Sequence, residues 1–486
     1  MGKHRITRRR FMEGTAAAGA ALLVPAGRVL GANETVRVGI VGLGGKGTQH
    51  AGEFARLKDV TVAALSDVDV QRSGRAEQKK LKSQGKVPRY QDFRRILDDK
   101  SIDAVVFATP NHWHVLNTVL ACQAGKDVYV EKPISHSIWE GRKSVEAARK
   151  YDRIVQSGTQ QRSDPGVIEA AADLRKGFLG KVQWVHSMWY RHRPPIGKVD
   201  KPTPIPDHVD YNLWCGPRPT VPLMRKRLHY DWHWIWDYGN GDMGNLMPHL
   251  TDDVRHLLAW DDVPQRVMSV GRRFGWDDDG ETPNTHWALM LHDGLPVVIE
   301  FRDLPYKADK RGVSVYRRFG KGFRFTNLVK CEGGFYAVTR GGGSAYDNDG
   351  KRVKEYRGDG GRGHTANFIQ AVRSHKVADL AADIELGHYG AIMCHMANLS
   401  HRVGAQTGID QVRDRVKGYE EALETLDQMV KHLADNNIDV AKEKPVLGPW
   451  LDYDFEAERF TGDHAAAANK LVREDYRKPF VVPEEV

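Results

Sequence analysis

The chain has 486 residues, which exceeds one ordinary core and predicts two domains with extensions. Its formal net charge is +9, but residues 1–32 hold six Lys or Arg and one Glu, which leaves +4 for the remainder. So small an excess, without a dense basic cluster, argues against nucleic acid as a partner. The four cysteines are far apart in sequence, so neither structural zinc nor a disulfide framework is predicted.

Residues 1–32 resemble an export signal. Arg8, Arg9 and Phe11 belong to a twin-arginine pattern, and a weakly apolar stretch follows over residues 16–26. That stretch is too short to span a hydrocarbon layer of about 30 Å. Ala26 and Ala32 mark two candidate cleavage positions. We therefore expect a periplasmic or otherwise exported protein with no membrane attachment in its mature form; a disordered basic arm is the alternative.

Strand and helix patterns alternate through residues 33–155. Buried-strand runs occur at 36–43, 60–67, 103–110 and 127–133, and helical runs occur at 48–57, 93–99 and 114–125. Alternation of this kind is typical of a parallel sheet covered by helices on both faces. The fold class predicted is therefore α/β, with a doubly wound parallel sheet in the N-terminal domain.

A glycine motif follows the first predicted strand. Gly42, Gly44 and Gly47 form GxGxxG at the start of a helix, with Gly45 inside the turn. The first glycine allows the tight turn, the second lets a pyrophosphate approach the backbone, and the third permits close packing of helix on strand. A glycine-rich turn also occurs in α/β sheets that bind no nucleotide, so the motif needs support from elsewhere in the chain.

That support comes from the acid that ends the second predicted strand. Asp67 stands twenty-five residues after Gly42, near the position where an acid would hold a ribose 2′-hydroxyl. A carboxylate there repels the extra phosphate of NADP, so the predicted cofactor is NAD. Asp69 is the less favoured substitute.

The next segment carries a more specific pattern. Residues 108–137, ATPNHWHVLNTVLACQAGKDVYVEKPISHS, contain TP-x-x-x-H, an AGK turn and the triplet EKP, and SGTQQRS follows at 157–163. These motifs, in this order, resemble the Gfo/Idh/MocA oxidoreductases. The resemblance covers most of residues 35–405, and it implies an N-terminal Rossmann domain, a C-terminal α/β domain and activity on sugars or cyclitols.

The resemblance also implies roles for individual residues. In the family the EKP lysine, here Lys132, meets the substrate hydroxyl beside the nicotinamide, where a cation would stabilise a developing alkoxide. The proline after it is typically cis. The residues implied to touch the cofactor are Thr109, Pro110, His114, Glu131, Lys132 and Gln160. A solvated lysine and a helix-capping histidine are the structural alternatives for Lys132 and His114.

The pattern changes in the second half of the chain, where residues 156–405 are predicted to form the substrate domain. Alternating runs at 182–190, 285–294 and 296–303 predict largely antiparallel strands with one face on a core. Residues 364–404 predict helices that return to the first domain. Residues 406–486 form a C-terminal extension with a helix over 419–434 and a polar, proline-punctuated end.

Residues 229–253 are the stretch richest in side chains that could take part in catalysis or binding. By resemblance His249 is the general base and Asp253 a further acid, because a histidine titrates near operating pH and can accept the carbinol proton. Asn245 stands where many relatives have Asp, and Asp242 lies seven residues before His249. The acid partner of His249 is therefore open, and a buried structural histidine is the alternative reading.

Aromatic residues crowd the same stretch. Trp232, Trp234 and Trp236 alternate, so an extended conformation would place them on one face, suited either to stacking on a sugar or to an ordinary core. No metal site is predicted, because His112-x-His114, or Asp231 with His233, lacks further ligands at suitable spacing.

The sequence therefore predicts an exported enzyme with tightly bound NAD(H) that oxidises a secondary hydroxyl of a sugar, glycoside or cyclitol. A homo-oligomer is expected. The first alternative is an NAD-dependent glycoside hydrolase that oxidises, eliminates, adds water and reduces again. A non-catalytic NAD(H) sensor is the second alternative.

Overall fold

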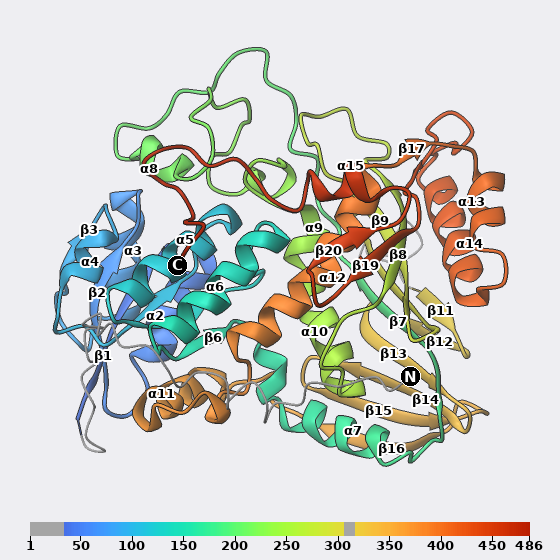
Figure 1. Ribbon diagram of the computed structural model, residues 1–486, viewed down its shortest axis with the longest axis horizontal. Coiled ribbons are helices and arrows are strands. Elements are labelled where there is room, and N and C mark those ends of the chain that lie inside the picture. Colours follow the sequence, from blue (N-terminus) through green and yellow to red (C-terminus); the bar gives the residue numbers. More distant parts are fainter. Residues whose placement is uncertain (1–33, 306–315) are drawn as a thin grey trace, which may run out of the picture.

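The computed structural model describes residues 34–305 and 316–486 (Figure 1). The predicted export signal lies outside these residues. Two sheet-based units lie side by side, the first in blue and teal and the second in green, yellow and orange. In the described part of the chain, every helix is too short or too polar to cross a membrane.

The first domain is built on a six-stranded sheet in which every neighbouring pair of strands is parallel. In spatial order its strands are β3 (Arg89–Tyr90), β2 (Val60–Ser66), β1 (Val36–Val41), β4 (Ala104–Phe107), β5 (Asp127–Val130) and β6 (Val155–Ser157). The strand order reverses between β1 and β4, which leaves a crevice beyond the carboxyl ends of the strands where ligands bind. The predicted doubly wound sheet is confirmed.

Helices cover both faces of this sheet, because its strands are buried on both sides and carry apolar residues almost continuously. Phe54, Ala76 and Phe368 share one buried cluster, and Ile96, Val119 and Val145 belong to the other. One layer is α2 (Gly45–Phe54), α3 (Val70–Lys80) and α11 (His364–Ser374), followed by η4 (Val377–Asp379); the other is α4 (Arg94–Asp98), α5 (His114–Gln123) and α6 (Ile138–Lys150). α11 comes from the later part of the chain, and its Phe368, Ile369 and Val372 pack in the cluster of the first domain.

The second domain contains a mostly antiparallel sheet of twelve strands. In spatial order they are β16 (Arg352–Arg357), β15 (Gly342–Asp347), β14 (Gly334–Thr339), β13 (Phe325–Cys331), β7 (Val182–Tyr190), β10 (Leu295–Arg302), β9 (Thr285–His292), β8 (Arg266–Arg272), β18 (Val446–Leu447) and β17 (Ala405–Gln406), with β19 (Leu451–Asp454) and β20 (Arg459–Thr461) attached at β8. β7 and β10 form the parallel pair at its centre.

Both faces of this sheet are covered, whereas the alternating pattern predicted one. Against one face pack α7 (Pro165–Arg175), α10 (Met247–Leu258) and α12 (Ile384–Arg402). Against the other pack α13 (Ile409–Arg415), α14 (Glu420–Asp435) and the hairpin of β11 (Tyr316–Arg318) and β12 (Lys321–Phe323). Trp287 and Leu289 on β9 face α14 residues Leu426 and Met429. The two helices of this second layer, α13 and α14, therefore come from the C-terminal extension.

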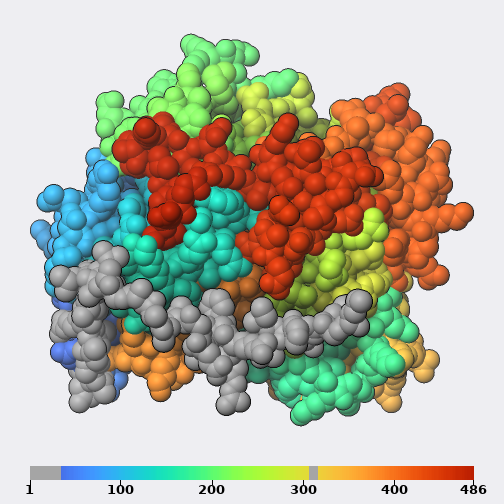
Figure 2. Space-filling view, viewed as in Figure 1, coloured from blue at the N-terminus to red at the C-terminus, as the bar shows by residue number. Residues whose placement is uncertain are grey.

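The end of the chain returns to the first domain. After α15 (Ala465–Asn469), Phe480, Val482 and Val486 are buried in the same cluster as residues of α5 and α6. Figure 2 shows this segment in red, crossing from the second domain to the first. The predicted polar strip, residues 470–486, is thus a packed strap, because Phe480, Val482 and Val486 lie against α5 and α6, whereas Val481 is exposed.

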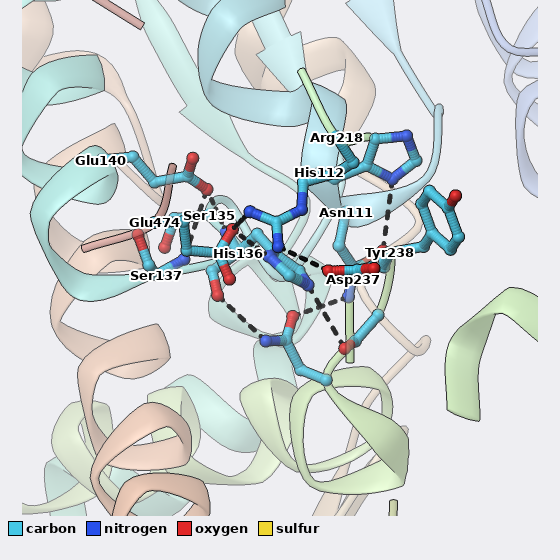
Figure 3. A network of polar contacts seen from close by, with 12 residues as sticks. Asn111, His112, Ser135, His136, Ser137, Glu140, Arg218, Asp237, Tyr238 and Glu474 are labelled. Atoms are coloured by element: carbon cyan, nitrogen blue, oxygen red, sulfur yellow. Dashed lines mark hydrogen bonds and ion pairs between the residues drawn. The ribbon is translucent and has the colours of Figure 1, made fainter. Parts of the chain in front are cut away.

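Polar contacts fasten the strap beside the domain junction (Figure 3). Glu474 accepts a hydrogen bond from Arg218 Nη1 at 2.8 Å and lies 2.7 Å from His136 Nδ1. The amide of Asn240 donates to the carbonyl of His136 at 3.0 Å. These contacts join the loop before α6 to the segment containing α8 (Tyr211–Cys215), η3 (Asp231–Trp234) and α9 (Gly241–Asn245). That segment forms one wall of the site.

Candidate active site

A cavity of about 740 Å³ opens at the carboxyl edge of the parallel sheet, between the two domains. Its size suits a bound cofactor or substrate. Of the residues predicted from sequence, its lining includes Gly42, Gly44, Gly45, Asp67, Thr109, Pro110, His114, Glu131, Lys132, Gln160 and His249. Gly47 and Asp253 lie outside the lining. Residues separated by more than 200 positions thus face one space.

The glycine turn has the shape that a dinucleotide requires. Gly42 has φ +83°, and a Cβ there would lie 2.7 Å from the carbonyl of Ala108. A Cβ on Gly47 would lie 1.8 Å from the Gly42 oxygen, whereas one on Gly45 would meet nothing within 4 Å. α2 begins at Gly45 without a side-chain cap, so its first amide groups are available to a pyrophosphate. These residues fit NAD.

Asp67 lies at the end of β2 and is bound to the glycine turn. Its Oδ2 accepts from the amide of Leu43 at 2.6 Å, and its Oδ1 accepts from the amide of Asp69 at 2.9 Å. Burial raises the pKa of Asp67 to about 6. Asp69 instead caps α3 through the amides of Gln71 and Arg72 and lies 3.0 Å from His229 Nε2, outside the cavity lining.

These positions give a prediction for cofactor binding. Asp67→Ala should weaken NAD binding by about tenfold or more, because it removes both a charged acceptor and the acceptor that holds the turn. Asp69→Ala should change NAD affinity less, although it should lower stability through loss of the α3 cap. Fluorescence titration of the apoprotein with NAD measures both. Equal loss of affinity in the two variants would contradict the assignment.

Glu131 of the EKP triplet is held by three side chains at the floor of the cavity. His50 Nε2 lies 2.7 Å from its Oε1, Gln160 Nε2 donates at 3.0 Å, and Lys46 Nζ lies 3.7 Å away. Burial alone would raise the pKa of Glu131, but the charge of Lys46 and the contact with His50 hold it below its usual range. η2 (Gln160–Ser163) places Gln160 here.

His114 connects two pieces of backbone. It begins α5 directly after η1 (Asn111–Trp113), and its ring nitrogens lie 2.6 Å from the Pro133 carbonyl and 2.8 Å from the Thr109 carbonyl. Burial lowers its pKa. The Lys132–Pro133 bond is cis, as the resemblance implied. His114 borders the cavity, but its contacts favour a structural role for the ring over direct cofactor binding.

Lys132 lies in the cavity wall beside Asn245. Its Nζ donates to the Asn245 carbonyl at 2.6 Å and lies 3.2 Å from Asn245 Oδ1, while the Asn245 amide donates to Asp242 at 2.9 Å. Burial lowers the pKa of Lys132 to about 8. Asn245 thus orients the lysine, which the sequence did not suggest. The Asp242 carboxylate forms an ion pair with Arg193, whose Nε donates to it at 2.9 Å.

His249 projects from α10 into the same cavity. Its ring lies 5.9 Å from that of Trp189, and its Nδ1 has no partner in the part of the chain that the structure describes. Burial and then the charge of Lys132 lower the pKa of His249 well below its usual range, so the ring is neutral at pH 7. Asp253, one turn later on α10, is buried against Asn327 and Gln161. Asp253 lies outside the cavity lining, and its catalytic role stays a prediction.

The tryptophan run is not extended, so the condition under which its side chains would share one face is not met. Residues 231–234 form η3, whose three-residue period turns successive side chains in different directions. Trp232 packs with Trp214 and Tyr238 and also borders the cavity, whereas Trp234 is buried near Arg193. The alternation was a coincidence of composition within a compact turn.

Several cavity residues were not singled out from the sequence. Trp189, Arg191, Trp214 and Arg340 all line it. Trp189 and Arg191 stand at the end of an alternating strand, a place where ligand contacts gather, so their position in the run could have indicated them. Arg340 precedes a run of three glycines in a hairpin turn and carries no local signal of a site.

Comparison with known proteins agrees with this geometry. Residues 36–159 match the family model described as "Oxidoreductase family, NAD-binding Rossmann fold", and residues 177–303 match its "C-terminal alpha/beta domain". Together the matches cover just over half of the chain. The fold and the glycine turn define an NAD-binding oxidoreductase. The chain belongs to the Gfo/Idh/MocA oxidoreductase family.

Curated relatives match about a third of the chain. A myo-inositol 2-dehydrogenase of Thermotoga maritima is 27% identical over 176 residues, which is 36% of this chain and 48% of the relative. An NAD(+)-dependent scyllo-inositol 2-dehydrogenase of Bacillus subtilis is 33% identical over 146 residues, 30% of this chain and 42% of the relative. The chain thus spans about half or less of the length of these relatives.

Solved structures share the fold over a longer stretch. A levoglucosan dehydrogenase in complex with NADH has a TM-score of 0.56 at 15% identity, over 75% of this chain and 96% of that one. The WlbA dehydrogenase of Bordetella pertussis, in complex with NADH and UDP-GlcNAcA, has a TM-score of 0.55 at 17% identity, over 75% and 94%. At these identities the likeness supports the fold alone.

Proposed function

We propose that the protein catalyses NAD-dependent oxidation, or the reverse reduction, at a secondary hydroxyl of a sugar, glycoside or cyclitol. The observation that carries this proposal is that Lys132 and neutral His249 border the same cavity as the glycine turn. The names of the curated relatives, inositol 2-dehydrogenases, support a polyhydroxylated substrate. Neutral carbohydrates, cyclitols and their derivatives are all within this class.

Each side chain has a distinct task in that reaction. NAD bound at the glycine turn would supply the hydride acceptor for the carbinol carbon. The Lys132 ammonium holds the carbinol oxygen and stabilises the negative charge that develops there. His249 accepts the hydroxyl proton, which its neutral ring can do at pH 7. Asn245 holds the lysine by two contacts, so the ammonium is positioned before substrate arrives.

The charge state of Lys132 predicts the pH dependence. The ammonium form is lost as pH rises through a pKa of about 8, so turnover should fall along an alkaline limb there. Asn245→Asp places a carboxylate beside the amine and should raise its pKa by about one unit or more, which moves the limb upward. The pH profile of kcat/KM measures this shift.

A matched variant controls for the added charge. Asn348 accepts from Lys330 at 2.6 Å on an exposed turn outside the cavity lining, so Asn348→Asp makes the same change beside another lysine. It should leave the limb in place. A limb that does not move in the Asn245 variant would remove Lys132 as its source.

The experiment that tests the function begins with the bound cofactor. Purified protein is denatured, the released nicotinamide is identified by mass spectrometry, and free sugars, cyclitols and glycosides are then screened. NADH formation from a free sugar or cyclitol supports the dehydrogenase. Hydrolysis of a glycoside without net NADH would support the glycosidase alternative instead. The export-like leader favours that alternative, because a cofactor that is recycled within the site does not depend on free NAD outside the cytoplasm. Release of NADP in place of NAD would contradict the cofactor assignment within the proposal.

Export is part of the proposal and rests on residues 1–32 alone. Replacing Arg8 and Arg9 by lysine should leave folded, active protein inside the cell, because the pattern requires the arginine pair. Cell fractionation measures this. Unchanged export would contradict the twin-arginine assignment and favour a simple basic arm.

A further inference from the structure

Two arginines that line the cavity have no acidic partner in the described part of the chain. Arg191 and Arg340 both border it, and within residues 34–305 and 316–486 neither forms a salt bridge. The one side-chain hydrogen bond of the pair in that part of the chain runs from Arg340 Nε to the Gly360 carbonyl at 3.3 Å. By contrast, nearby Arg193 is neutralised by Asp242 at 2.9 Å. A guanidinium without an acidic partner, as in Arg191 and Arg340, can bind a carboxylate or a phosphate.

Sheet register places these arginines around the catalytic centre. Trp189 on β7 pairs with Phe325 on β13, and Asn327 on β13 pairs with Val338 on β14. The turn after β14, which holds Arg340, is therefore level with Trp189 at about 10 Å across two strand spacings. Arg191 follows Trp189 by two residues, so alternation directs both to the same face. The Trp189 ring in turn lies 5.9 Å from that of His249.

The charges at the glycine turn are separate from this pair. Lys46 and Arg72 lie there, where the pyrophosphate of the cofactor belongs. The acidic residues of the lining, Asp67 and Glu131, are already engaged by backbone amides and by His50 and Gln160. After burial and the charge of Lys132, the charge of Arg340 also contributes to lowering the pKa of His249, so its field reaches the reacting end of the cavity.

We propose that the substrate carries an anionic group, a carboxylate or a phosphate ester, which Arg191 and Arg340 bind while its carbinol lies between Lys132 and His249. This deepens the proposed function and rests on it. The shared chemistry is a compact anion on a polyhydroxylated ring. A carboxylate would make the substrate a sugar acid or its glycoside, and a phosphate ester would make it a sugar phosphate.

The test compares matched ligands on the NAD-loaded protein. Calorimetry measures the binding of hexoses (glucose, galactose, mannose), of the corresponding hexuronates and of the hexose 6-phosphates. Tighter binding of one anionic series by about tenfold or more over its neutral hexose is expected, and the series that binds identifies the group. Neutral hexoses that bind as well as both anionic series would overturn the proposal.

Variants assign the effect to the two arginines. Arg191→Gln and Arg340→Gln should each weaken binding of the anionic ligand by about tenfold and leave that of its neutral hexose unchanged. For a ligand that is turned over, KM should rise while kcat is largely kept. The control is Arg324→Gln, an exposed arginine before β13 that lies outside the cavity lining. Loss of less than twofold in both site variants would overturn the proposal.

The two proposals fail in different ways. If the dehydrogenase proposal is wrong, no ligand reduces the bound cofactor, but calorimetry still reports whether the anion binds and whether it needs both arginines. If only the anion is wrong, neutral sugars or cyclitols reduce NAD as well as acids do, and the arginine variants behave like the control.

Discussion

His249→Ala should lower turnover by about a hundredfold or more while NAD affinity stays near that of the unmodified protein. The neutral ring of His249 borders the cavity, and it is the one histidine of α10 in the cavity lining. Steady-state rates and a separate NAD titration distinguish chemistry from cofactor binding.

A second histidine on the same helix provides the control. His256 lies seven residues after His249, outside the cavity lining, and burial lowers its pKa to about 4. His256→Ala should therefore leave turnover within a fewfold. Near-normal turnover in the His249 variant would remove that residue from the mechanism, and Asp253 or Asp242 would become the next candidate for the base.

Lys132→Ala should have an effect of the same order, again with NAD binding largely kept, because it removes the cation that stabilises the alkoxide. Lys143→Ala is the matched control, since Lys143 pairs with Glu146 on α6 and lies away from the cavity. Equal rates for the two lysine variants would contradict the role assigned to Lys132.

Local patterns predicted the first domain well, because its signals are local. The strands of the parallel sheet are continuous apolar runs, and GxGxxG describes a turn whose geometry needs those glycines. Gly42, for example, has a positive φ and no room for a Cβ. Such features are encoded within a few residues, so the sequence is sufficient to indicate them.

Contacts between distant segments were not predictable in the same way. In sequence, Asn245 stands where an acid partner for His249 is expected, yet in the structure it contacts Lys132, which lies 113 residues earlier in the chain. The strap residues Phe480, Val482 and Val486 show no helical or strand period, and only the surface of the first domain gives them a reason to be buried. In both cases a partner far along the chain decides the role.

The final prediction separates two glycines of one motif. Gly47→Ala should lower the free energy of unfolding by about 3 kcal/mol or more, because its Cβ would lie 1.8 Å from the Gly42 oxygen and force α2 away from the turn. Gly44→Ala meets only the Arg72 side chain, at 3.0 Å, so the apoprotein should keep most of its stability. Thermal melts of both apoproteins measure the difference.

Cofactor binding should rank the same variants differently. A methyl group at Gly44 stands where the backbone must approach the pyrophosphate, so Gly44→Ala should lose NAD affinity with little loss of apoprotein stability. Gly363→Ala, at the N-cap of α11 with helical backbone angles and nothing within 4 Å of an added Cβ, controls for the change of residue itself. A Gly44 variant as unstable as the Gly47 variant, or one with unchanged NAD affinity, would contradict the assignment of stability to Gly47 and of cofactor binding to Gly44. If both results are obtained, Gly47 maintains the packing of α2 on the sheet, and Gly44 leaves the backbone open for the approach of the cofactor's pyrophosphate.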